Sequence, residues 1–221
     1  MRNEHGFSFA GERMVARPSG ALYWPSADLL CVSDLHLGKS ERTARRGGPL
    51  LPPYEVIDTL TRLEEDIAAT DPRAVVSLGD AFDDMAAVAA MVPDALDWIR
   101  RLMAGRDWTW VTGNHDPAPT GLGGHAADGL TCGPLSFVHV ATSSGRAEVS
   151  GHYHPKASLR VRGRAVSRPC FLRDDARLIL PAYGTYTGGL RSRDPALAGL
   201  MAPGARAILA GRPMVEIPMP R

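Results

Sequence analysis

Three short apolar runs along the chain each end in a cluster of polar residues. The runs are LLCV at 29–32, AVVSL at 74–78 and WTWV at 108–111, and such continuous apolar stretches predict strands buried on both faces. Between them, apolar residues recur at helical spacing in residues 49–72 and 85–105. Alternating strands and helices predict a layered α/β core, whose strands place their polar clusters at one edge of the sheet.

Proline and glycine residues predict where the two helical patterns begin and end. Pro52 and Pro53 precede the first pattern, and Pro72 follows it as a stop signal. Pro93 is expected to split the second pattern, and Gly105 to end it.

Beyond residue 130 the pattern changes to short strands separated by glycine, proline and serine turns. The expected strands lie within residues 135–140, 146–154, 157–167 and 176–184. Residues 121–133, in contrast, have the composition of a loop. We expect the later strands to form a second sheet that packs on the first, so that residues 1–221 make a single domain.

Composition limits the classes of function that fit this chain. It has 221 residues, 44% of them hydrophobic, and a formal net charge of +1, so any nucleic-acid or membrane binding must come from local patches. Its three cysteines lack the spacing of a metal site and are expected to be reduced. No apolar run is long enough for a membrane span or a signal peptide, which favours a soluble cytoplasmic protein without a membrane partner.

The polar clusters contain the side chains that divalent transition metals prefer. Asp34 and His36 are two residues apart, so on an extended strand both would point to the same side, and the same holds for His152 and His154. Taken alone, this motif is explained equally well by a metal site and by structural roles, with Asp34 as a helix cap and His36 as a hydrogen-bonded loop residue. Together the oxygen and nitrogen ligands, with no thiolate among them, predict a metal site. Its expected members are Asp34, His36, Asp80, Asn114, His115, His139, His152 and His154.

The order of these motifs resembles that of the calcineurin-like metallophosphoesterases. Asp-x-His, Gly-Asp, Gly-Asn-His-Asp, a lone histidine after an apolar strand and Gly-His-x-His follow one another over residues 34–154. More narrowly, SDLHLGKSERTARRGGPLLPP, GHYHPK, RPCFL and LILPAYGTYTGGL are similar to segments of the bacterial DNA-ligase-associated metallophosphoesterases, which are regarded as DNA damage response endonucleases. This resemblance extends over nearly the whole chain and implies a four-layer α/β/β/α sandwich.

The resemblance also implies a site with two divalent metal ions about 3.5–4 Å apart, which would activate water against phosphorus. The implied ligands are Asp34, His36 and His154 for one ion, Asn114, His139 and His152 for the other, and Asp80 as a bridge between them. Manganese is the first expectation, with iron and zinc as alternatives, because nitrogen and oxygen ligands bind all three.

His115 is the expected catalytic residue. It would hydrogen-bond a phosphoryl oxygen or protonate the departing alkoxide, and Asp116 would orient it. The alternatives are that His115 positions Asn114, and that Asp116 forms a turn before Pro117.

Two residues near these motifs have open roles. Asp83 stands where close relatives often carry histidine; it is no ligand in the implied scheme, and it could tune the site or the substrate preference. His125, in the sequence GLGGHAADG, could approach the substrate, or it could be a solvated loop residue.

Local basic and aromatic residues give weaker indications of nucleic-acid binding. Four cations directly after the Asp-x-His motif could contact phosphates, but a solvated face shared with Glu41 explains them equally well. They are Lys39, Arg42, Arg45 and Arg46. Arg160, Arg162 and Arg164 alternate and are expected on one face of a strand. Further along, Tyr183 and Tyr186 could stack bases or serve the core, and Trp98, Trp108 and Trp110 are expected to pack in the interior.

The resemblance, together with the predicted metal site, implies a dinuclear-metal-dependent phosphodiesterase or endonuclease that acts on single-stranded DNA in bacterial DNA repair. Repair proteins such as a DNA ligase or a helicase are its implied partners. A phosphomonoesterase or small-nucleotide hydrolase with the same metal site is the alternative, because the rim of a site sets its substrate. A non-catalytic scaffold is disfavoured because every expected ligand is present.

Overall fold

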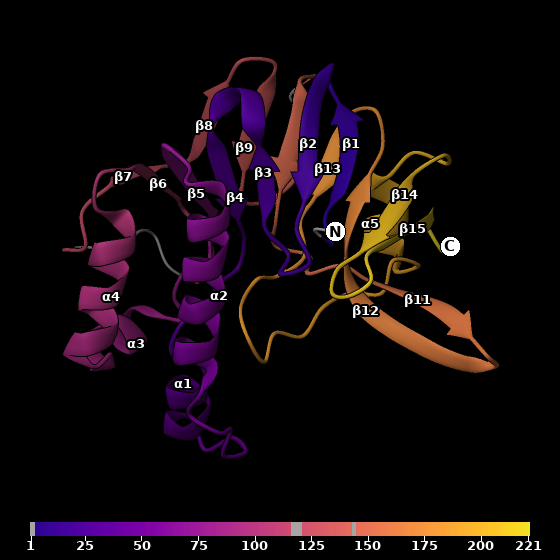
Figure 1. The fold of residues 1–221 in the computed structure, drawn as a ribbon. Coiled ribbons are helices and arrows are strands. Elements are labelled where there is room, and N and C mark those ends of the chain that lie inside the picture. Colours follow the sequence, from indigo (N-terminus) through magenta and orange to yellow (C-terminus); the bar gives the residue numbers. More distant parts are fainter. Residues whose placement is uncertain (1–2, 116–120, 143–144) are drawn as a thin grey trace.

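The chain folds into two β-sheets packed face to face, with helices outside them (Figure 1). The computed structural model describes residues 3–115, 121–142 and 145–221. The first sheet contains, in spatial order, β1 (His5–Phe9), β2 (Glu12–Ala16), β3 (Leu22–Trp24), β4 (Leu29–Val32), β5 (Ala74–Leu78), β6 (Asp107–Val111) and β7 (His125–Ala127). The second contains β15 (Val215–Pro218), β14 (Arg206–Leu209), β12 (Arg164–Arg173), β13 (Arg177–Ile179), β10 (Ala147–Ser150), β9 (Leu135–Val138) and β8 (Gly129–Cys132), and β11 (Lys156–Val161) pairs with β12.

The first sheet aligns the ends of the three strands that carry the polar motifs. β4, β5 and β6 pair in parallel, with Val32 opposite Ser77 and Ser77 opposite Trp110. Their carboxyl ends therefore lie at one edge of the sheet, as the alternation of strands and helices predicts. The antiparallel strands β1 to β3 extend the sheet beyond β4.

Alternate residues of these strands supply two different cores. Leu30 and Val75 pack against α2 (Glu55–Thr70) and α4 (Pro93–Met103) on the outer face. Cys31 and Val76 point the other way, into a core shared with the second sheet. The two predicted helical regions are confirmed, and Pro93 splits the second by starting α4 after the short α3 (Met85–Ala90).

A third apolar core covers the outer face of the second sheet. Leu172, Ile179 and Leu209 pack there against Leu197 of the short helix α5 (Pro195–Leu200). The three cores separate four layers, so the predicted α/β/β/α sandwich is confirmed, with a much thinner helical layer on this side. The assignment of residues 1–221 to one domain stays a prediction.

Several elements differ from the sequence-based prediction. Residues 121–133 are not only a loop, because β7 and β8 lie within them and extend one sheet each. The N-terminal strands β1 to β3, the C-terminal strands β14 and β15, the turn η1 (Pro25–Ala27) and the helix α1 (Lys39–Arg45) were not predicted. None of the helices in the described ranges is long and apolar enough to cross a membrane.

A buried polar network ties α2 to the rest of the fold. Asp66 is 4% exposed and accepts hydrogen bonds from Arg17 Nε at 2.6 Å, Ser19 Oγ at 2.5 Å and the Tyr183 hydroxyl at 2.8 Å. Replacing Asp66 by alanine would leave these buried donors without their acceptor. We therefore expect Asp66→Ala to lower the free energy of unfolding by about 3 kcal/mol or more, measured by urea denaturation.

The matched control for this prediction is Asp97→Ala on α4. Asp97 pairs with Arg100 at 2.7 Å, but their side chains are 60% and 48% exposed, so the loss should stay below about 1 kcal/mol. Equal losses in the two variants would contradict the structural role given to Asp66.

Candidate metal centre

The candidate site is built from loops that leave the ends of strands in both sheets. Asp34 and His36 follow β4, Asp80 follows β5, and Asn114 follows β6. His139, His152 and His154 come from the second sheet, after β9 and β10.

The backbone at this site is unusual. Five of the candidate ligands have positive φ angles: Asp34 (54°), His36 (44°), Asp80 (45°), His152 (70°) and His154 (46°). Left-handed backbone is costly for residues with a Cβ, and it concentrates where function requires it. The prediction that Asp34 and His36 converge because they lie on an extended strand is therefore wrong in its reason, since neither residue is extended.

One group of ligands gathers Asp34, His36 and His154. The Nε2 atoms of His36 and His154 are 3.4 Å apart, and His154 Nε2 lies 3.1 Å from Asp34 Oδ1. Asp34 is completely buried. Its second oxygen accepts hydrogen bonds from Ser33 Oγ and, at 2.9 Å, from the backbone N–H of His152.

A second group of ligands gathers Asp80, His139 and His152, with Asn114 beside them. His139 Nε2 lies 2.8 Å from Asn114 Oδ1, 3.2 Å from His152 Nδ1 and 3.5 Å from Asp80 Oδ2. His139 Nδ1 also lies 4.0 Å from Asp34 Oδ1, so the two groups are adjacent. All seven sequence-predicted ligands are thus brought together.

The chemistry of these contacts fits a bound cation. His139 Nδ1 is 2.9 Å from the carbonyl oxygen of Leu78, which can only accept, so Nδ1 carries the proton. With the proton on Nδ1, the neutral form of the ring presents a lone pair at Nε2 toward Asn114 and His152. Ligand atoms each about 2.1 Å from one ion are separated by about 3–3.5 Å, close to the nitrogen separations observed. In addition, Asp34 Oδ1 is buried and accepts no hydrogen bond from the described residues. A metal ion would satisfy both features.

The two carboxylates are ionised at neutral pH. Burial acts to raise the pKa of Asp80, but the nearby His139 ring and the hydrogen bond from the His115 backbone N–H outweigh it and lower that pKa to about 2. Burial likewise acts to raise the pKa of Asp34, but the side chain of His154, whose Nε2 lies 3.1 Å from Asp34 Oδ1, outweighs it, so this pKa is also lowered. The site therefore presents negative charge to a cation.

Two glycines allow the loops to approach one another. Gly79 has a φ of 71°, and a Cβ there would clash with the His139 ring. A Cβ on Gly151 would clash with the hydroxyl of Ser33 and with Asp34 Oδ2. The glycines of the Gly-Asp and Gly-His-x-His motifs are thus needed for close packing around the ligands.

His115 lies next to the first group of ligands. Its ring meets that of His36 edge-on, with 5.1 Å between the ring centroids, and its backbone N–H donates to Asp80 Oδ1 at 2.8 Å. Its Nδ1 is 2.9 Å from the carbonyl oxygen of Asp83, so Nδ1 carries a proton and Nε2 is the ring atom available to contact a substrate. Asp116, predicted to orient this ring, lies outside the described residues.

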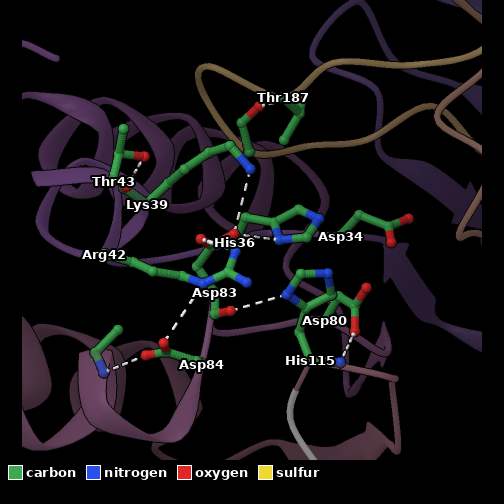
Figure 2. A network of polar contacts seen from close by, with 12 residues as sticks. Asp34, His36, Lys39, Arg42, Thr43, Asp80, Asp83, Asp84, His115 and Thr187 are labelled. Atoms are coloured by element: carbon green, nitrogen blue, oxygen red, sulfur yellow. Dashed lines mark hydrogen bonds and ion pairs between the residues drawn. The ribbon is translucent and has the colours of Figure 1, made fainter. Parts of the chain in front are cut away.

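Asp83 connects the ligands to helix α1 (Figure 2). It is 1% exposed; its Oδ1 lies 2.8 Å from His36 Nδ1 and 3.2 Å from Lys39 Nζ, and its Oδ2 accepts a hydrogen bond from Arg42 at 2.8 Å. Burial acts to raise the pKa of Asp83, but these three partners outweigh it and hold that pKa well below its ordinary value. A carboxylate that holds the far nitrogen of a ligating histidine fixes which nitrogen faces the metal. This position fits the tuning role left open for Asp83 in the sequence, although the sequence motifs do not reveal which residues it contacts.

The basic residues after the Asp-x-His motif are neutralised within the protein. Lys39 and Arg42 contact Asp83, and Arg45 contacts Glu41 and Asp84. Arg46, the most exposed of the four, is 3.9 Å from Asp84. The structure therefore favours the interpretation of this cluster as an ion-paired face over a phosphate-binding surface.

The prediction that Arg160, Arg162 and Arg164 share one face of a strand is wrong. The chain turns at Arg162 and Gly163, and Arg160 pairs with Ala165 while Arg164 pairs with Val161. Neighbouring pairs along a two-stranded ribbon point to opposite faces, so Arg160 and Arg164 lie on different sides.

Other sequence-predicted candidates lie apart from the ligands. His125 is exposed in β7, opposite Thr109, and belongs to no metal-ligand group of the described residues. Tyr183 is buried in the core, whereas Tyr186 is 37% exposed. Trp108 and Trp110 are buried as expected, and Trp98 packs partly buried against the same core.

Comparison with known proteins identifies similar sequences and folds. A family model described as calcineurin-like phosphoesterase matches residues 27–179. The crystal structure of the Pseudomonas putida nuclease MPE has 28% sequence identity and a TM-score of 0.75, over 97% of this chain and 100% of that one. The E. coli phosphoesterase Yfce has 12% identity and a TM-score of 0.42, over 87% of this chain and 99% of that one. No curated protein sequence matches significantly.

Proposed function

The chain belongs to the calcineurin-like phosphoesterase family and is a metal-dependent phosphoesterase, and we propose that it is a manganese-dependent phosphodiesterase and endonuclease that cleaves single-stranded DNA. The matched residues, 27–179, contain every candidate ligand. Similarity to a nuclease along the full length of both chains supports a diester as the substrate.

The observation that carries this proposal is the pair of adjacent ligand groups. Asp34, His36 and His154 would hold one divalent ion, and Asn114, His139 and His152 the other, with Asp80 between them. Bound divalent ions supply a Lewis acid for the phosphoryl oxygens and lower the pKa of water, which provides a nucleophile at neutral pH. Manganese fits a set of imidazole, amide and carboxylate ligands without thiolate, as do iron and zinc.

The chain's own residues would then orient the substrate and move protons. His115 is held by the Asp83 carbonyl through Nδ1, so its Nε2 is the atom that would donate a proton to the departing alkoxide or a hydrogen bond to a phosphoryl oxygen. Asp83 also holds His36 through its carboxylate, so one residue positions both a ligand and the proposed acid.

The biological setting of this proposal follows from the resemblance of the sequence to DNA-ligase-associated phosphoesterases. We propose a role in bacterial DNA repair in the cytoplasm, with a DNA ligase or helicase as partner. A phosphomonoesterase or small-nucleotide hydrolase with the same ligands is the competing function, because the ligands alone do not select the ester.

A substrate comparison tests the proposed function. Purified protein loaded with manganese should hydrolyse bis(p-nitrophenyl) phosphate and nick single-stranded DNA, while p-nitrophenyl phosphate should react poorly. Asn114→Ala, which removes one proposed ligand, is the control for contaminating activity and should be inactive. Hydrolysis of the monoester with both diesters left intact would overturn the proposal in favour of the phosphatase.

Asp83→Asn should weaken the site without removing a ligand. The amide keeps the shape of the side chain but loses the charge that holds His36, Lys39 and Arg42. We expect the affinity for manganese to fall by about 10–100-fold, measured by metal titration of the apoprotein.

Asp84→Asn is the matched neighbour for this test. Asp84 pairs with Arg45 and caps α3 by accepting from the N–H of Ala87, but it contacts no candidate ligand among the described residues. The manganese affinity of this variant should stay within about threefold of the wild type, because Asp83 still holds His36. Similar losses in both variants would show that Asp83 acts only through the general charge of this region.

A further inference from the structure

The hairpin formed by β11 and β12 extends beyond the second sheet. Its strands pair from Lys156 opposite Pro169 to Val161 opposite Arg164, whereas the pairing of β12 with β14 begins only at Cys170. Residues 156–169, called the arm below, therefore form a two-stranded ribbon, which packs on the third core at its root through Ala157 and projects from the body of the molecule at its tip (Figure 1). Six residues of β11 give it a length of roughly 20 Å.

The arm carries only positive charge. Residues 155–173 contain six lysine and arginine residues and no aspartate or glutamate. Two of the six are bound to the body of the protein, since Arg168 donates to backbone carbonyls that include Pro213 O at 2.9 Å, and Arg173 contacts Glu216 at 2.7 Å. A third, Lys156, donates to Thr187 O at 3.3 Å.

The three arginines at the far end of the arm, unlike the other cations of this segment, are not bound to the body of the protein. Arg160, Arg162 and Arg164 are exposed, and their side chains form no hydrogen bond or ion pair with another described residue. In contrast, the four cations near α1 are all paired with carboxylates. Three unpaired arginines close together on a narrow ribbon repel one another and attract polyanions.

The turn at the tip retains an arginine in an unfavourable conformation. Arg162 has a φ of 49° and Gly163 one of 79°, the pattern of a two-residue hairpin turn with both central residues left-handed. Asn, Asp and Gly accept the first of these positions at lower cost than arginine. Arg162 thus gives the turn no local advantage, which favours a role for its exposed charge.

The root of the arm adjoins the candidate metal centre. β11 begins two residues after His154, a proposed ligand, and Lys156 forms a backbone bridge with Arg191. Arg191 is exposed, and its side chain likewise forms no ion pair or hydrogen bond with the described residues. Positive charge therefore continues from the tip of the arm to the root beside the ligands.

We propose that the arm binds the sugar-phosphate backbone of single-stranded DNA on one side of the bond cleaved at the metal centre. The inference rests on the proposed function and adds a binding surface outside the metal ligands. Because Arg160 and Arg164 lie on opposite faces of the ribbon, the strand would pass across the tip and contact charges on both sides. Such contacts are made to phosphates, so they depend on salt and not on base sequence.

The test replaces the three tip arginines by glutamine. Binding of a fluorescent oligonucleotide of about 20 nucleotides is measured by anisotropy in metal-free buffer, between about 50 and 200 mM salt. Each phosphate contact of a single strand contributes about 0.7 to the slope of log affinity against log salt, so R160Q/R162Q/R164Q should lower that slope by about 2. Over this range the wild type should lose roughly 20-fold more affinity than the variant.

Two further variants separate local contacts from net charge. R160K/R162K/R164K keeps the charges and should bind nearly as well as the wild type. R13Q/R100Q/R101Q removes three exposed arginines from β2 and α4, away from the arm, and should keep the wild-type slope (Figure 1). A wild-type slope in the glutamine variant of the arm, an equal loss in the distant variant, or a wild type that does not bind would each overturn the inference.

The same proteins distinguish failure of this inference from failure of the proposed function. Hydrolysis of bis(p-nitrophenyl) phosphate with manganese tests the metal centre, because this ester is too short to reach the tip of the arm. Normal diester hydrolysis with an unchanged salt slope in the arm variant contradicts only the arm. Loss of diester hydrolysis in the wild type contradicts the proposed function.

Discussion

Asp80→Asn is expected to abolish most of the activity and to remove at least one metal ion from each chain. The Asp80 carboxylate, with a pKa of about 2, lies 3.5 Å from His139 Nε2, and the same carboxylate accepts the His115 N–H. Asparagine keeps the shape and the hydrogen-bond acceptor but removes the negative charge that the ions require. We expect hydrolysis of bis(p-nitrophenyl) phosphate to fall on the order of 10³-fold or more.

The measurement pairs the rate of hydrolysis with the metal content of the purified chain, determined by mass spectrometry. Asp97→Asn removes an exposed carboxylate of α4 and should leave both quantities unchanged. Full metal content with a rate near that of the wild type in Asp80→Asn would contradict the placement of Asp80 between the ions.

His115→Ala is expected to separate chemistry from metal binding. His115 lies with His36 and Asp83 in a third cluster of possible ligands, but Asp83 is committed to Lys39 and Arg42, and the proposed centre uses His115 in neither ligand set. The metal content should therefore stay at the wild-type level. Loss of a general acid costs about 10²–10⁴-fold in turnover. The loss should be larger for DNA, whose alkoxide leaving group needs a proton, than for a p-nitrophenyl diester, whose leaving group is stable as an anion.

The leaving-group comparison distinguishes the two roles considered for His115. If His115 only positions Asn114, its removal should lower the metal content and slow both substrates by the same factor. His125→Ala is the control, because this exposed histidine of β7 lies outside the ligand groups of the described residues.

The layered fold and the gathering of ligands could be predicted because they depend on local patterns. Continuous apolar strands such as Leu29–Val32 mark the interior, and the polar residues after parallel strands must meet at one edge. The strand β1 could also be predicted from the sequence, since Phe7 and Phe9 alternate with polar residues as in a half-buried strand.

The partners of Asp83 could not be predicted from the sequence, which left its role open, because they lie far from it along the chain. Lys39 and Arg42 precede Asp83 by about 40 residues, and only the folded chain shows that they surround one buried carboxylate. The sequence shows the charges of these residues but not which of them face solvent.

The backbone of the ligand loops is a second feature that the sequence conceals. Spacing arguments assume regular strand or helix geometry, and Asp34 and His36 adopt neither. They are held beside residues 79–81 by backbone hydrogen bonds such as His36 N–H to Asp80 O at 2.9 Å. The turn at Arg162 and Gly163 misled the strand prediction for the same reason, because a two-residue hairpin interrupts an otherwise continuous pattern.

The most direct test of the metal centre is anomalous diffraction from crystals grown with manganese. The account predicts two anomalous peaks in each chain, one among Asp34, His36 and His154 and the other among Asn114, His139 and His152. Crystals of protein that hydrolyses a diester, but with no ion between these side chains, would contradict it.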